Sequence, residues 1–160
     1  MDLDVLKNWL DGSALPDPEL LLEKLGPVLW FLLMAGPVLL VIMGLLYRFA
    51  APSEANHHFG FRCYFGMGSV QAWQFTQRLA GITWIVLGVG LAIAMLVVKQ
   101  RVLAGLDVME MLLHALSCVL VQVGLLLIAS VVIRFIVACT FDRHGVRRRD
   151  KRKQRKQNQV

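Results

Sequence analysis

The sequence predicts an all-α integral membrane protein, a bundle of three transmembrane helices with an N-terminal amphipathic helix and a disordered basic C-terminal tail. The chain of 160 residues is 57% hydrophobic and only 18% charged. Its charges gather at the two ends and in short connections, which leaves three long apolar runs at residues 26–49, 79–98 and 111–139. Backbone groups in lipid must be paired within helices or closed barrels, and these runs are too long and continuous for barrel strands.

Each apolar run is long enough to cross a hydrocarbon core of about 30 Å. At about 1.5 Å per residue the three runs extend roughly 36, 30 and 43 Å as helices, so the third must tilt or extend past the lipid. Gly36-Pro37 in the first run predicts a bend, either a packing kink or, alternatively, a gating hinge. In the second run, Gly88 with Ala92 and Gly90 with Ala94 have the small-x-x-x-small spacing that lets helices approach closely. The runs and their connections form one membrane domain over residues 26–141.

The two ends of the chain lie outside this domain. Residues 1–25 carry leucines at helical spacing and predict an amphipathic segment at the membrane interface; a lid or partner-binding helix is the alternative. A signal peptide is not expected, because the first residues are acidic. Residues 142–160 are low in complexity and basic, so we expect a disordered or weakly helical tail that contacts anionic lipid headgroups rather than nucleic acid.

The basic residues are distributed unevenly, which predicts an orientation. Nine lysines and arginines lie in the tail, two in the connection and one, Arg48, at the end of the first run beside it, against four on the other side. The positive-inside rule then places the connection and the C-terminus in the cytoplasm and the N-terminus outside.

The connection at residues 52–81 is the most distinctive part of the chain, because it is aromatic, glycine-rich and basic. Asn56 favours a turn, and Gly60 permits a backbone conformation that other residues resist. Arg62 lies among aromatic residues and is suited to bind a phosphate or carboxylate, with Glu54 as one candidate partner.

The second half of the connection predicts the start of a helix that continues into the second span. Ser69 is a candidate N-cap. Trp73 and Gln77 lie four residues apart and therefore share one face of this helix.

Several residue types of the connection recur at defined spacings, in the pattern Asn56-x-x-x-Gly60-Phe61-Arg62 followed by Ser69-x-x-x-Trp73-x-Phe75-x-x-Arg78-x-x-Gly81. This pattern resembles the signature of the SdpI-type family of bacterial membrane proteins, over residues 52–98. Cys63 departs from that signature, which usually has threonine or serine there. The resemblance implies a multi-span membrane protein with a protective or signalling role, since the family's named member gives immunity to a secreted peptide toxin and sequesters a repressor at the membrane.

We therefore predict a non-enzymatic membrane protein that recognises a peptide toxin or a membrane protein partner through this connection. The candidate binding residues are Asn56, Gly60, Phe61, Arg62, Trp73 and Arg78. One alternative is an accessory subunit of a larger membrane complex, docked through the small residues of the second run. Another is an oligomeric transporter or channel subunit, with Gln122 and Arg134 as its intramembrane polar candidates. Gln122 is expected to face other helices, and Arg134 to reach the headgroups or line a polar cavity.

Catalysis has little support in the sequence. His57-His58 is the one feature that suggests a metal or a proton shuttle, and it lacks a carboxylate-rich set nearby. Paired acids, a nucleophile motif and a phosphate loop are absent from the sequence. The three cysteines, Cys63, Cys118 and Cys139, form no metal or redox motif. We therefore expect no catalytic residue, metal or cofactor.

Overall fold

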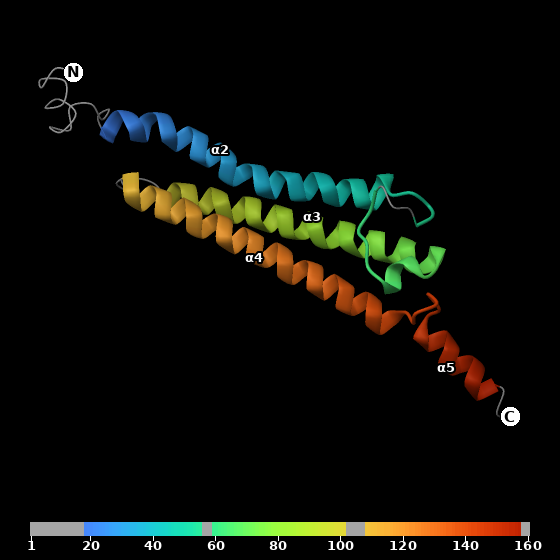
Figure 1. Ribbon diagram of the computed structural model, residues 1–160. Coiled ribbons are helices and arrows are strands. Elements are labelled where there is room, and N and C mark those ends of the chain that lie inside the picture. The colour runs from blue at the N-terminus through green and yellow to red at the C-terminus, as the bar shows by residue number, and fades with distance from the viewer. Residues whose placement is uncertain (1–17, 56–58, 102–107, 158–160) are drawn as a thin grey trace, which may run out of the picture.

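Three long helices run side by side in the computed structural model, which describes residues 18–55, 59–101 and 108–157 (Figure 1). The helical elements are α2 (Pro18–Leu45), the π-helical turn η1 (Leu46–Ala50), the 3-10 turn η2 (Phe65–Met67), α3 (Val70–Arg101), α4 (Val108–Thr140) and α5 (Arg148–Gln157). In chain order, α2 leads through η1 and the connection to α3, and α4 returns to the same end, where α5 follows.

Three segments are long and apolar enough to cross a membrane: Gly26–Ala50, Val70–Lys99 and Met109–Thr140. This confirms the predicted all-α architecture with three spans. The expected amphipathic segment at residues 1–25 falls mostly outside the described residues, which begin at Pro18 as part of α2.

Glycines allow α2 and α3 to pack with their backbones close together. A Cβ added at Gly81 would lie 2.9 Å from the Gly44 carbonyl oxygen, and one added at Gly88 would lie 2.8 Å from the Pro37 carbonyl oxygen. Such small-residue contacts are a main source of helix association in lipid, where burying apolar side chains gains little. Gly88 thus packs against α2, whereas Gly90 is exposed and a Cβ added there would meet no other segment within 4 Å.

The buried residues form two clusters, one towards each end of the bundle. One cluster contains Leu33, Met95 and Ala115, from the three long helices. The other lies beside the connection and contains Phe61, Ala72, Ala80, Ile133, Val137 and Phe141. Many other large apolar side chains point outward, for example Phe31 at 73% exposed and Val86 at 66%. An outward apolar surface is what a bundle surrounded by lipid requires.

The basic tail, which was expected to be disordered or weakly helical, forms the helix α5 over residues 148–157. A tight turn connects it to α4. The Asp142 carboxylate accepts hydrogen bonds from the backbone N–H groups of His144 (3.0 Å) and Val146 (3.1 Å). It also forms an ion pair with the Lys151 ammonium at 2.7 Å. The turn thereby fixes the start of α5, which favours the helical alternative over disorder.

Candidate functional site

The connection is held against the first turns of α3 by a buried glutamine. The Gln77 amide donates from Nε2 to the Phe61 carbonyl oxygen at 2.9 Å and accepts the Phe61 N–H on Oε1 at 2.8 Å. It therefore pairs with residue 61 as a neighbouring β-strand would. Gln77 is 2% exposed, so both bonds satisfy backbone groups that water does not reach.

Trp73 supports the connection at two places. Its indole Nε1 donates to the Pro52 carbonyl oxygen at 2.9 Å, just beyond η1. The face of the ring lies against Gly60, which has a φ of +123°. A Cβ at Gly60 would lie 2.6 Å from the indole, so both the backbone conformation and the close approach require glycine.

Ser69 begins α3 and also links it to the far end of the chain. Its hydroxyl oxygen accepts the Ala72 N–H at 3.1 Å, which confirms the predicted N-cap. The same hydroxyl donates to the Gly145 carbonyl oxygen at 2.8 Å, 76 positions later in the turn before α5. The connection and this turn are therefore joined at one end of the bundle.

Aromatic rings fix the remaining side of the connection. Tyr47 packs edge-on against Phe59 and Trp84, with ring centroids 5.6 and 5.4 Å apart, and Phe61 packs edge-on against Trp84 at 6.2 Å. These edge-to-face contacts are worth about 0.5–1.5 kcal/mol each beyond area burial. Residues 59–69 of the connection thus form an ordered cap on α2 and α3.

The predicted binding residues divide into a buried set and an exposed set. Trp73 is fully buried, Phe61 is 8% exposed, and Gly60 packs under the indole, so all three build the cap. Arg62 and Arg78 have exposed side chains. Asn56 lies outside the described residues, as do His57 and His58.

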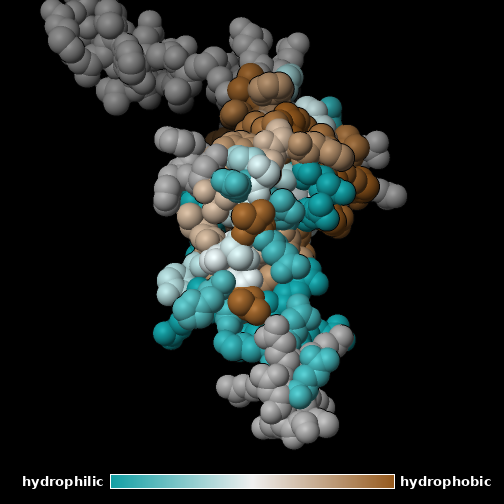
Figure 2. Space-filling model, turned by 90° about the vertical axis from the view of Figure 1, so that its right-hand side faces the viewer, coloured by the Kyte–Doolittle hydropathy of each residue, from teal (hydrophilic) through white to brown (hydrophobic). Residues whose placement is uncertain are grey.

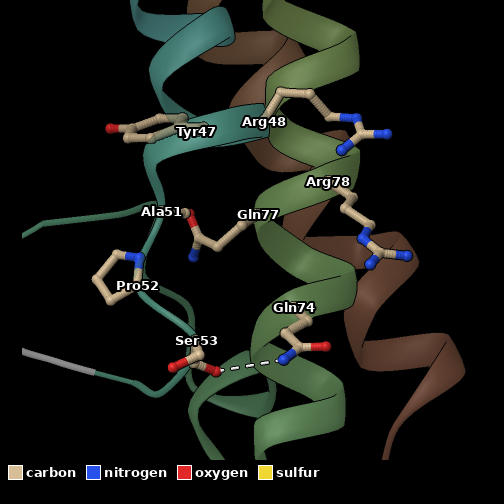
Figure 3. A pocket seen from close by; sticks show the side chains of 8 residues that line it. All are labelled: Tyr47, Arg48, Ala51, Pro52, Ser53, Gln74, Gln77 and Arg78. Atoms are coloured by element: carbon tan, nitrogen blue, oxygen red, sulfur yellow. Dashed lines mark hydrogen bonds between the residues drawn. The ribbon is translucent and has the colours of Figure 1, made fainter.

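The exposed arginines lie in two different pockets at this end of the molecule, where hydrophilic residues gather (Figure 2). Arg78 lines a pocket of about 220 Å³ with Arg48 of η1. Ser53 and Gln74 also line this pocket, and the Gln74 amide donates to the Ser53 carbonyl oxygen at 3.4 Å. Both guanidinium groups extend to the same side of α3 (Figure 3). This pocket is polar on most sides and is suited to a carboxylate or another small anion.

Arg62 lines the second pocket, which is a groove between the connection and α4 with a volume of about 580 Å³. Arg134 of α4 lies in the same groove, so two candidates that are 72 positions apart come together. Its remaining lining residues are Cys63, Tyr64, Phe65, Val131, Phe135 and Ala138.

Gln122, the other intramembrane candidate, binds the backbone of α2. Its amide Nε2 donates to the Leu33 carbonyl oxygen at 3.2 Å. Leu33 lies four residues before Pro37, which has no N–H to donate to that carbonyl. A Cβ at Gly36 would lie 2.5 Å from the Gln122 Oε1, so the glycine makes room for this amide. Gln122 therefore completes the hydrogen bonding of a proline-containing helix instead of standing free in a channel.

The described residues contain no group of three or more His, Cys, Asp or Glu side chains placed to hold a metal ion. Cys63, Cys118 and Cys139 are free thiols, and only Cys139 is exposed.

Comparison with known proteins identifies the family. The family model described as the SdpI/YfhL protein family matches residues 53–141, more than half of the chain. The chain belongs to this family. No curated protein and no solved structure matches it.

The SdpI/YfhL match covers most of the connection, α3 and α4, and it extends beyond the region over which the sequence pattern was recognised. It includes Ser53, Gln77, Arg78 and Arg134, and it stops before the turn that carries Gly145. Sequence reasoning missed the role of Gln77. Its signal was a polar amide on the same helical face as Trp73, but its partner, a backbone 16 positions earlier, could not be read from spacing.

Proposed function

We propose that this SdpI/YfhL family protein is a non-enzymatic membrane protein that recognises a peptide toxin or a membrane protein partner through its connection. The observation that carries the proposal is the polar pocket of Arg48 and Arg78. Within the described part of the chain, neither guanidinium forms an ion pair. Glu54, the one acid of the connection, is exposed and also forms none within that part.

The construction of the connection also supports recognition rather than simple bracing. Gln77 and Trp73 fix its backbone at Phe61 and Pro52 through hydrogen bonds, so the pocket of the two arginines, which Pro52 and Gln77 also line, has a rigid base. A rigid base lowers the entropy that a partner must overcome on binding. An immunity or signalling role, as the family resemblance implies, needs such a preformed surface more than it needs a catalytic centre.

Alanine variants of the two pocket arginines test this proposal. Cells expressing the full chain are challenged with secreted toxic peptides, and bound proteins are recovered in mild detergent. We expect Arg48→Ala and Arg78→Ala to lower protection or partner recovery by about tenfold, which corresponds to about 1.4 kcal/mol. Arg143→Ala, an equal charge loss outside the pocket, is the matched control. Full protection and full recovery by a correctly inserted double variant would show that the pocket is not the recognition site.

The orientation and location are part of the proposal. We place the protein in a bacterial inner membrane, with the connection and α5 in the cytoplasm, and the excess of basic residues at that end supports this. The basic tail then contacts anionic lipid headgroups. Reporter fusions at the C-terminus that are active only in the cytoplasm or only outside it test the orientation, and activity of the outside reporter would reverse it.

A second candidate function is an accessory subunit of a larger membrane complex. One observation favours it: Gly90 and Ala94 are exposed on α3, away from the contact that Gly88 makes with α2. Small residues at this spacing permit another helix to approach. If this face docks a subunit, Gly90→Leu abolishes co-purification of that subunit in mild detergent, whereas Arg78→Ala leaves it intact. The reverse pattern, in which Arg78→Ala abolishes co-purification and Gly90→Leu does not, supports recognition through the connection.

A further inference from the structure

Two arginines from separate segments line one groove at the end of the bundle that carries the connection. Arg62 lies in the connection and Arg134 in α4, and apolar or aromatic side chains make up most of the remaining wall. The volume of about 580 Å³ falls within the range of about 300–1,000 Å³ that small-molecule sites occupy. This groove is separate from the pocket of Arg48 and Arg78 that carries the proposed function.

The two guanidinium groups have no counter-charge of their own. In the described residues, the side chains of Arg62 and Arg134 form neither an ion pair nor a hydrogen bond, and the single ion pair found there joins Lys151 to Asp142. Two like charges around one groove repel each other and favour an anion between them. A phosphate group suits this arrangement because guanidinium donors bind its oxygens in pairs.

The depth of the groove indicates where the phosphate comes from. Arg134 lies six residues before the end of α4 at Thr140, which is about 9 Å along the helix axis. Arginine at this depth reaches towards the headgroup level of a bilayer. On the same stretch of α4, Val131 is 63% exposed and Phe135 is 68% exposed, so the groove opens onto the lipid-facing surface.

From this combination we infer a specific binding site for one anionic phospholipid. Its phosphate lies between Arg62 and Arg134, and an acyl chain follows Val131 and Phe135 along α4. A free phosphate ion would use the two charges but none of the apolar wall. The site is distinct from the diffuse attraction of the basic tail, because it is formed by side chains of the connection and a span. Lipid bound there bridges the connection to α4 and stabilises their contact.

Native mass spectrometry of the full chain in mild detergent tests the inference. The protein is mixed with dioleoyl phosphatidylglycerol or dioleoyl phosphatidylcholine, and the fraction that retains one lipid is measured as the lipid concentration is lowered. We expect wild type to prefer phosphatidylglycerol by about tenfold, since the zwitterionic phosphocholine headgroup has no net charge. Arg62→Gln/Arg134→Gln should lose this preference. Arg48→Gln/Arg78→Gln removes the same charge at the same end and should keep it.

Single variants and a phosphate competition complete the design. Arg62→Gln and Arg134→Gln are measured separately, so a double variant that does not fold leaves the test intact; each should weaken retention at least threefold. Equal losses in the Arg48→Gln/Arg78→Gln control would overturn the site, because general charge would then explain binding. Inorganic phosphate that displaces the lipid at equal concentration would also overturn it, since the apolar wall would contribute nothing.

Discussion

The hydrogen bond between Gln122 and the Leu33 carbonyl is expected to stabilise the bundle because Pro37 leaves that carbonyl without its usual donor. The Nε2 to oxygen distance is 3.2 Å. Side-chain hydrogen bonds between membrane helices average about 0.6 kcal/mol and reach about 1.7 kcal/mol. An unsatisfied buried carbonyl costs about 1–3 kcal/mol. Gln122→Leu, which keeps the side-chain volume, should therefore lower the free energy of unfolding by about 1–2 kcal/mol.

The test is a double-mutant cycle with Pro37→Ala, measured by unfolding in mixed micelles with increasing dodecyl sulfate. Alanine restores an N–H at position 37 that can donate to Leu33, so Gln122→Leu should cost about 0.5 kcal/mol or less in that background. Ser130→Ala is the matched control, since the Ser130 hydroxyl bonds the Leu126 carbonyl of its own helix at 2.9 Å. An equal cost of Gln122→Leu in both backgrounds, or a cost no larger than that of Ser130→Ala, would refute the reasoning.

Three further predictions concern the connection and the tail. Gln77→Leu removes two buried hydrogen bonds and should lower the free energy of unfolding by about 2–4 kcal/mol. The control Gln74→Leu removes one long hydrogen bond from an exposed side chain and should change the free energy of unfolding by less than about 0.5 kcal/mol. Similar losses in the two variants would contradict the role of Gln77. Gly60→Ala should cost at least about 1–3 kcal/mol in the same assay, because of its positive φ and its contact with the indole, and a neutral result would show that the connection relaxes freely. The Lys151 ammonium and nearby backbone N–H groups lower the pKa of Asp142 from 3.8 to about 2. The stability that the Asp142 carboxylate contributes is therefore present above about pH 4 and is lost as the pH falls towards about 2. Hydrogen exchange should show that α5 loosens over that range, and Asp142→Asn should loosen α5 already at about pH 7.

The three spans could be predicted because their signal is local. Length and hydropathy are sufficient to identify a membrane helix, and the N-cap at Ser69 needs only the residues that follow it. The shared face of Trp73 and Gln77 was likewise readable from spacing, and both residues are buried.

The partners of these residues could not be predicted, since they depend on contacts between distant parts of the chain. The bond from Gln122 to Leu33 spans 89 positions, and the groove brings Arg62 beside α4. For the tail, the sequence left disorder and a weak helix open. Its residues are highly charged and favour disorder when taken alone, but the Asp142 turn anchors them to the end of α4.

The hydrogen bond from Ser69 to Gly145 has a mechanical consequence. It fastens the turn before α5 to the N-cap residue of α3, and a Cβ added at Gly145 would lie 2.5 Å from the carbonyl carbon of Gly68. A force on the tail is therefore transmitted to the start of α3 at Ser69 instead of being lost in a flexible linker. A membrane surface or a protein that binds the tail therefore also acts on the segment that carries Arg62 and Arg78.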